Sequence, residues 1–327
     1  MADGNLIFYL ITFAVAFFIT GISVKKLIPV LKRSAEQPIY EEGPAWHLKK
    51  QGTPTMGGIG FVFASALSLS LASAYLLFMD EDYFARSLLL TLSFALANAL
   101  IGIIDDYAKI RKKENAGLTP LQKILLQTAA ATLFLIGRRI FLVTDAAIHF
   151  SFGTVDLGVL YYPIALIMLV GTVNSANLTD GVDGIAAGVS FAIGLSLAFM
   201  SSGANYEVGF IAFALMGIAV AFLIFNLHPA KIFMGDTGSL LLGALAAAAC
   251  TSLGNPLIII FVGAVYIIES LSVIIQVLFF KITRKRLFKM APFHHHLEKC
   301  GWPENKIVIW AIIITLIFSL PAFLIFV

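Results

Sequence analysis

The chain has 327 residues, of which 59% are hydrophobic and only 13% charged, and its mean hydropathy is +0.93. This composition excludes a soluble globular domain of this length. The two cysteines, Cys250 and Cys300, are too few and too differently placed for a disulfide framework. We expect no nucleic-acid partner.

Hydrophobic runs long enough to cross about 30 Å of hydrocarbon recur along the whole chain. Helices satisfy every backbone polar group within the segment, so an open sheet is excluded. The sequence therefore predicts an all-α, polytopic integral membrane protein, with residues 1–327 as one transmembrane domain. The ten predicted spans are residues 5–24, 57–79, 87–104, 120–136, 158–173, 184–201, 207–226, 238–253, 256–280 and 306–327.

The first apolar run, residues 5–24, resembles a signal peptide only in length. Asp3 stands where a basic n-region would lie, and Lys25 and Lys26 follow the run instead of preceding it. We interpret it as a retained first span with its N-terminus outside the cell.

The loops between the spans divide into two sets with very different charge. The first set is 25–56, 105–119, 174–183, 227–237 and 281–305, and the second is 80–86, 137–157, 202–206 and 254–255. The first set, with the span ends that touch it, holds 19 of the 22 Lys and Arg residues, and the second holds only Arg86, Arg138 and Arg139. The positive-inside rule makes the first set cytoplasmic, which places both termini outside. Residues 140–157 alternate weakly around a glycine turn and predict a short external β-hairpin.

Polar sequences gather in the cytoplasmic set of loops. They are HLKKQGTPTMGG (47–58), GIIDDYAK (102–109), NSANLTDGVDG (174–184), FNLHPAKIFMGDTGS (225–239) and APFHHHLEK (291–299). The external loop 137–157, although of similar length, carries no comparable cluster. Convergence of five loops on one side of the membrane predicts one cytoplasmic active site.

In the first of these loops, Lys50 precedes GTPTMGG, which contains Thr55 and the pair Gly57-Gly58. The simpler interpretation of Lys50 is that its positive charge only helps to set the orientation of the chain in the membrane. The glycine pair next to threonines indicates a tight turn facing an anion.

Asp105 and Asp106 follow the apolar run ALANALIGII. Two adjacent carboxylates repel each other and raise each other's pKa unless a cation lies nearby. Solvated charge at a helix end is the simpler reading, but the helix dipole disfavours negative charge at a C-terminus. We therefore expect both residues to act in catalysis.

Asn177, Asp180 and Asp183 lie between two apolar runs. The two acids are three residues apart and share one face if a helix begins near Thr179. Helix capping explains one of these residues but not all three.

Asp236 lies in FMGDTGS, where Gly235 and Gly238 allow close backbone approach. Capping of the following span is one reading of this motif. A metal site is the other, because Mg²⁺ binds through one or two carboxylates together with substrate phosphates.

His294, His295 and His296 follow Pro292. Consecutive helical residues point about 100° apart, so the three rings cannot all face one zinc ion. Hydrogen bonding to phosphates is the favoured role, and a solvated surface run is the alternative. Glu269 falls inside a predicted span and is read either as a packing group bonded to Ser270 or as a functional acid.

Taken in order, TPTMGG, GIIDDY, NLTDGVDG, FMGDTGS and APFHHHLE resemble the phospho-N-acetylmuramoyl-pentapeptide transferases, a branch of the polyprenyl-phosphate N-acetylhexosamine-1-phosphate transferase superfamily. The resemblance implies a ten-helix fold and a homodimer. It also implies the first membrane step of peptidoglycan synthesis, in which UDP-N-acetylmuramoyl-pentapeptide and undecaprenyl phosphate give lipid I and UMP with Mg²⁺ as cofactor.

For this reaction we assign Mg²⁺ to Asp236, with Asp106 as a helper. Asp105 is expected to engage the lipid phosphate, as a positioning group or as a base, and the three histidines to contact the donor. The resemblance assigns a further site. A nucleoside pocket that also takes the family's nucleoside inhibitors is expected around Asn177, Asp183 and Phe233. The remaining expected substrate-binding residues are Lys50, Thr55, Asp180, Asn226, Gly235 and Ser239.

Two other functions remain open from the sequence. One is a UDP-N-acetylglucosamine:polyprenyl-phosphate transferase, which shares the aspartate motifs. The other is a transporter, whose polar residues line a path near the bilayer midplane, often with internal repeats. We find no internal repeat in this sequence.

Overall fold

The computed structural model describes residues 2–32, 50, 52–112, 117–201 and 205–326. Its long helices are α1 (Ala2–Leu31), α2 (Ile59–Phe78), α3 (Asp82–Lys112), α4 (Pro120–Phe141), α5 (Tyr161–Thr179), α6 (Ile185–Met200), α7 (Tyr206–Asn226), α8 (Gly235–Ser252), α10 (Ala264–Thr283) and α12 (Glu304–Phe326). The short elements are strands β1 (Ala147–Phe150) and β2 (Gly153–Asp156), the 3₁₀ turn η2 (Gly158–Leu160), and helices α9 (Ile258–Val262) and α11 (Phe293–Lys299). The chain is an all-α polytopic membrane protein with one small hairpin, as the sequence predicts.

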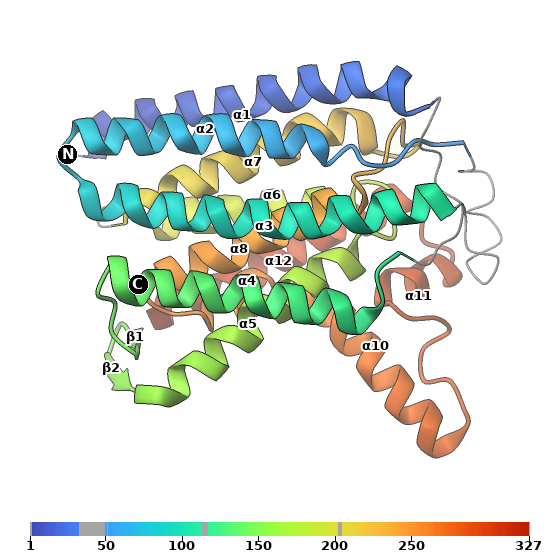
Figure 1. Cartoon of the computed structure of the whole chain (residues 1–327). Helices are drawn as coiled ribbons and strands as arrows, with labels where there is room; N and C mark the ends of the chain where they lie inside the picture. Colours follow the sequence, from blue (N-terminus) through green and yellow to red (C-terminus); the bar gives the residue numbers. More distant parts are fainter. Residues whose placement is uncertain (1, 33–49, 51, 113–116, 202–204, 327) are drawn as a thin grey trace.

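Helix α8 forms the centre of the bundle, and α3, α5 and α7 pack around it (Figure 1). Every residue of α8 except Gly235 is buried. Alanines fill most of its second half, so neighbouring backbones approach closely. Because protein surrounds α8, the polar sequence at its N-terminus is not exposed to lipid.

Eight helices in the described ranges are long and apolar enough to cross a membrane, whereas the sequence predicted ten spans. Each predicted span corresponds to a helix. However, α6 has only 16 residues, fewer than the roughly 17–25 that a spanning helix needs. The other predicted span that is not among these eight helices is α8, which is enclosed by protein and has 18 residues and a polar first turn.

The predicted span 256–280 is divided in two. Helix α9 ends before Gly263 and α10 begins after it. A Cβ at Gly263 would lie 2.8 Å from the carbonyl oxygen of Ile259, so the bend requires a residue without a side chain. Beyond this break, α10 leans away from the bundle (Figure 1).

The predicted hairpin is present, although α4 occupies the first residues of the predicted range. Its strands pair antiparallel, with Ala147 opposite Asp156 and Phe150 opposite Gly153. The backbone amide of Ser151 donates to the carbonyl oxygen of Ile325, 2.8 Å away, and thereby ties the hairpin to the C-terminal helix.

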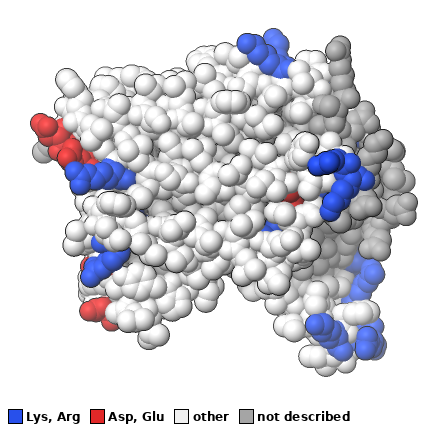
Figure 2. Space-filling model, viewed as in Figure 1, with Lys and Arg blue, Asp and Glu red and all other residues white. Residues whose placement is uncertain are grey.

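The chain's two termini and the hairpin lie at one end of the bundle, and α11 lies at the other (Figure 1). A broad band of uncharged surface separates the charged side chains near the two ends (Figure 2). This distribution is the one expected when a bilayer surrounds the middle of the molecule.

Candidate active site

Three buried carboxylates meet where α3 crosses the start of α8. Asp105, Asp106 and Asp236 each place an oxygen within 4.8 Å of the others, and we call them the carboxylate cluster. The helices approach this closely because a Cβ at Gly102 would lie only 2.5 Å from the backbone of Asp236. The structure therefore brings the DDYAK and FMGD motifs into one site.

Asp106 holds the N-terminus of α8. One of its oxygens accepts the backbone amide of Asp236 at 3.0 Å. The other accepts both the amide of Thr237 at 3.0 Å and its hydroxyl at 2.7 Å. The first amides of a helix have no partner within it, so Asp106 supplies a cap from a different helix. Asp236 is thus capped and does not itself form the cap.

Two lysines lie between the other two carboxylates. Lys109 contacts Asp105 at 2.6 Å and Asp236 at 3.1 Å. Lys123 contacts Asp105 at 3.0 Å and also forms an ion pair with Asp236. The second oxygen of Asp105 accepts the amide of Leu118 at 2.7 Å, which fixes the start of α4 against α3. The two ammonium groups therefore offset most of the negative charge of the cluster.

Asn177 reaches the cluster from the end of α5. Its amide donates to Asp236 at 3.1 Å and to the hydroxyl of Ser239 at 2.9 Å. Gly235 has φ +70°, and a Cβ there would lie 2.6 Å from Asp106 and 3.0 Å from the hydroxyl of Thr55. These four predicted substrate-binding residues surround Asp236.

The glycine pair in TPTMGG does not face an anion. The amides of Gly57 and Gly58 donate to the carbonyl oxygens of Phe233 and Met234, both at 2.9 Å. The amide of Phe233 in turn donates to the carbonyl oxygen of Pro54 at 2.8 Å. The turn is therefore committed to holding the FMGD loop, and the predicted anion-facing role of the pair was wrong. Residues 47–49, where this motif begins, lie outside the described residues.

A second cluster of charged groups surrounds Asp183. Lys50 contacts Asp183 at 2.7 Å and Glu304 at 2.8 Å. His228 contacts the same two carboxylates at 3.0 and 3.2 Å. Burial alone would lower the pKa of Lys50, but the charges of Asp183 and Glu304 outweigh it and raise that pKa above its ordinary value. Lys50 is therefore a firmly charged group that joins three segments of the chain.

Asp180 lies between these two clusters in a turn. The expected helix start at Thr179 was wrong, because Thr179 ends α5 and α6 begins only at Ile185. Burial, followed by the negative charges of Asp236, Asp106 and Asp183, raises the pKa of Asp180 to about 8. A carboxyl that keeps its proton at neutral pH donates a hydrogen bond instead of accepting one.

Asn226 connects two loops. Its side-chain oxygen accepts the amide of Gly184 at 2.9 Å, and its side-chain nitrogen donates to the carbonyl oxygen of Ile232 at 2.8 Å. In this structure both ends of the side chain are bonded to backbone, which supports the two loops that carry Asp183 and Phe233.

The three histidines face three different partners. His294 is 1% exposed and contacts Glu269 at 3.1 Å, and His295 contacts Glu298 at 2.6 Å. His296 accepts the backbone amide of Lys289 at 3.1 Å. The rings fan out around the short helix α11, as consecutive helical residues must.

Glu269 connects α10 to α11. Its carboxylate also accepts the backbone amide of His294, at 3.2 Å. Ser270 instead donates to Ser175, so the expected bond between Glu269 and Ser270 is not formed. Because Glu269 engages Nδ1 of His294, the Nε2 atom faces Gly181, where a Cβ would lie 2.2 Å from it.

Four charged residues of the site were not predicted as site residues. Lys109 had a local signal, since it lies four residues after Asp105 on the same helix. His228 lies in the polar sequence 225–239, but nothing in that sequence pointed to Asp183. Lys123 and Glu304 had no signal beyond their charge, because only the fold brings them to the site.

Comparison with known proteins agrees with this arrangement. The profile of Glycosyl transferase family 4 matches residues 85–254, which include the carboxylate cluster. The chain is 42% identical over 316 residues to the phospho-N-acetylmuramoyl-pentapeptide-transferase of Halalkalibacterium halodurans, covering 96% of each protein. It is 43% identical to the protein of the same name from Staphylococcus carnosus over 90% of this chain and 92% of that one. The one from Shouchella clausii is 42% identical over 98% of this chain and 97% of its own length.

Proposed function

Because the chain belongs to the phospho-N-acetylmuramoyl-pentapeptide-transferase family, we propose that it transfers this phospho-sugar-peptide from a UDP donor to undecaprenyl phosphate, giving lipid I and UMP. The protein is a multi-pass membrane enzyme, and its family is one of sugar-phosphate transfer. The carboxylate cluster is the reaction centre.

The observation that carries this proposal is the pairing of Asp105 and Asp236 with Lys109 and Lys123. Both substrates are anionic at the reacting phosphates, and phosphoryl transfer depends mostly on positioning and charge stabilisation. The ammonium groups of Lys109 and Lys123 offset the repulsion between two anionic substrates that meet at this site.

The cluster also fits Mg²⁺, because its donors are hard carboxylate oxygens within 4.8 Å of one another. Asp236 and Asp105 would hold the ion, since their partners include the side-chain ammonium groups of two lysines. All three hydrogen bonds to Asp106 come instead from the N-terminus of α8. When bound, Mg²⁺ supplies charge neutralisation at the transferring phosphate. Asp106 then contributes by fixing the loop that carries Asp236.

Asp105 positions the acceptor phosphate. A phosphate monoester has a second pKa of about 6 and is mostly dianionic at neutral pH. The acceptor therefore does not depend on a strong base, and a fixed carboxylate with two neighbouring lysines serves to orient it.

Phe233, Asn177 and Asp183 receive the uridine end of the donor. The backbone of Phe233 is fixed by its bonds to Pro54 and Gly57. Stacking of an aromatic ring on a base contributes about 1–3 kcal/mol. Asp180 and the histidines of α11 lie close together, since Nε2 of His294 faces Gly181, and they receive the diphosphate and sugar-peptide part of the donor. Nucleoside inhibitors of the family occupy the same pocket.

The functional unit is a homodimer in the bacterial cytoplasmic membrane, with the carboxylate cluster facing the cytoplasm. The asymmetry of Lys and Arg between the two sets of loops supports this orientation.

The test is UMP release by the purified protein in detergent with undecaprenyl phosphate and Mg²⁺. Two donors are compared, UDP-N-acetylmuramoyl-pentapeptide and UDP-N-acetylglucosamine. We expect turnover with the first and at least a hundredfold less with the second. Preference for the second donor would reassign the chain to the N-acetylglucosamine branch, and no release with either would reject a transferase.

A further inference from the structure

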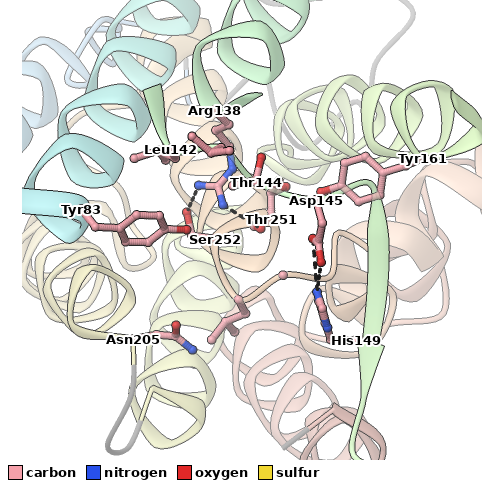
Figure 3. Close-up of a pocket in the computed structure, with 13 residues that line it drawn as sticks. Tyr83, Arg138, Leu142, Thr144, Asp145, His149, Tyr161, Asn205, Thr251 and Ser252 are labelled. Carbon is pink, nitrogen blue, oxygen red and sulfur yellow. Dashed lines mark hydrogen bonds and ion pairs between the residues drawn. The ribbon is translucent and has the colours of Figure 1, made fainter. Parts of the chain in front are cut away.

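Figure 3 shows a polar cavity of about 360 Å³. It lies at the other end of α3 and α8 from the carboxylate cluster. Its walls come from the ends of α3, α4 and α8, from β1, and from the connection between α4 and β1. Its volume falls within the range of about 300–1,000 Å³ that is typical of ligand sites. None of the residues in the proposed transferase mechanism lines it.

The cavity contains a buried cation, Arg138, whose side chain is only 4% exposed. Its guanidinium donates to the hydroxyls of Ser87 and Ser252 at 3.1 and 2.9 Å and to the carbonyl oxygen of Thr251 at 3.4 Å. All three acceptors are neutral, although the C-terminal end of α8 adds a favourable dipole. These bonds fix the guanidinium in place but do not neutralise it.

Neither of the nearby carboxylates contacts Arg138 directly. Glu207 accepts a hydrogen bond from the hydroxyl of Ser87 at 3.3 Å, so this hydroxyl separates it from Arg138, and its other oxygen has no hydrogen-bond partner among the described residues. Asp145 contacts His149 at 3.1 Å. Across the described ranges of the chain, Arg138 forms no ion pair with a carboxylate. A buried charge normally has a partner, so this cation lacks the anion that its burial calls for.

Other donors surround the same space. Tyr83 and Tyr161 lie on opposite sides of Arg138 with their hydroxyls toward the cavity, and Asn205 lies at its edge (Figure 3). A guanidinium together with hydroxyl and amide donors is suited to an anion that offers several oxygens, such as a phosphate.

The surface next to the cavity is apolar. Phe141 and Leu160 are 61% and 66% exposed, and Val143, which also lines the cavity, is 77% exposed. In a bilayer such residues face acyl chains or the interface. A ligand that combines a phosphate with acyl chains therefore matches both parts of this site.

We propose that this cavity binds a phosphate anion on Arg138, carried by an anionic phospholipid headgroup or taken up as the free ion. The guanidinium receives the phosphate oxygens, and the tyrosine hydroxyls complete its contacts. The site is separate from the transferase centre and does not depend on the proposed reaction.

The test measures binding to the delipidated, purified protein in neutral detergent by titration calorimetry. The probes are inorganic phosphate, dihexanoyl phosphatidylglycerol, and dihexanoyl glycerol as the phosphate-free control. Arg138→Gln is compared with Arg139→Gln, which removes the same charge from an exposed neighbour. We expect at least tenfold weaker phosphatidylglycerol binding in the first variant and less than a twofold change in the second.

The two sources of the anion are separated by the probes. Tight binding of phosphatidylglycerol with weak binding of phosphate identifies a lipid site, and equal affinities identify a site for the free ion. Equal losses in the two variants, or no saturable binding of either phosphate probe, would overturn the proposal. Phosphate held by the active-site lysines is unaffected by either substitution.

Because Arg138 is buried, Tyr83→Phe provides a second variant at a side chain that is 45% exposed. We expect it to weaken binding about threefold or more while UMP release stays at the wild-type level. If Arg138→Gln fails to fold, an unchanged affinity in Tyr83→Phe would itself overturn the proposal.

Discussion

Asp106 and Asp236 lie side by side, yet their oxygens have different partners. Those of Asp106 accept backbone and hydroxyl groups of the α8 N-terminus, which no substrate replaces. Those of Asp236 contact only side chains, namely the ammonium groups of Lys109 and Lys123 and the amide of Asn177. Asp106 therefore stabilises the structure of the site, whereas Asp236 is the carboxylate that can bind the metal or substrate.

For Asp236→Asn we expect loss of turnover, because an amide is a poorer Mg²⁺ ligand and no longer balances the two lysines. Folding should be retained, since Asp106 still caps α8 and Asp105 still pairs with both lysines. UMP release and size-exclusion chromatography measure the two effects. Near-normal Mg²⁺-dependent release would remove Asp236 from the metal site.

For Asp106→Asn we expect a loss of stability as well as activity. Asparagine keeps one acceptor oxygen but turns an N–H group toward the donors at the start of α8. A buried donor left without an acceptor costs about 1–3 kcal/mol. Thermal unfolding in detergent should show a lower melting temperature than for Asp236→Asn. Equal melting temperatures for the two variants would argue against the capping role.

The histidines of α11 are expected to contact the donor, not to form a zinc site. His294→Ala, His295→Ala and His296→Ala should include at least two variants with large losses of activity, because each ring faces a different partner and fills a different place. Elemental analysis of the purified protein should show no zinc. Stoichiometric zinc, or three fully active variants, would be incompatible with this role.

At the scale of the elements, uninterrupted apolar runs allowed the helices to be predicted well. All ten predicted spans correspond to helices, and the glycine turn of the hairpin was located correctly. The ends were less accurate where polar residues continue a helix. Helix α3 runs on to Lys112 because protein and solvent, and not lipid, surround its last turns. The break at Gly263 was missed because its cause is a close backbone approach within an apolar run.

The site was predictable where polar residues interrupt an apolar sequence, as at Asp105, Asp180 and Asp236. It was not predictable where a residue's role depends on a distant partner. From the sequence, Lys123 can be explained as a positive charge that sets the membrane orientation, and only the packing of α4 beside α3 brings it to Asp105. Glu304 can be explained as an acidic residue in the first turn of a helix, and only the fold brings it to Lys50. Such partners are set by tertiary packing, which local sequence patterns do not encode.

Glycine contacts between elements give a prediction of their own. A Cβ at Gly58 would lie 2.1 Å from the backbone nitrogen of Gly238, so Gly58→Ala must push the start of α2 away from α8. We expect a loss of about 1–3 kcal/mol, the usual cost of overpacking, and reduced UMP release because the loop carrying Asp236 moves.

Gly171→Ala is the matched control, because a Cβ at that position in α5 meets nothing within 4 Å. Alanine in a helix interior is favoured over glycine by about 0.5–1 kcal/mol, so this variant should be at least as stable as the wild type. Equal unfolding temperatures for the two variants would contradict the close contact at Gly58.

At the scale of the whole molecule, the chain separates two sets of charged groups by a band of uncharged surface (Figure 2). The carboxylate cluster and α11 are at one end, and the termini, the hairpin and the Arg138 cavity are at the other (Figure 1). A soluble nucleotide donor is made in the cytoplasm, so the first end has to face that side if the proposed reaction is correct.

The cysteines of the chain allow this orientation to be measured. Cys300 is exposed at the end of α11, whereas Cys250 is buried. A membrane-impermeant maleimide should label Cys300 in inverted vesicles and at least tenfold less in intact spheroplasts. In a Cys300→Ser background, Val155→Cys places a thiol on the hairpin at a side chain that is 49% exposed, and it should show the opposite pattern. Both thiols should react fully in detergent, which controls for accessibility.

Labelling of Cys300 in spheroplasts would reverse the orientation of the protein in the membrane. The donor could not then reach the carboxylate cluster, so this result would also count against the proposed reaction.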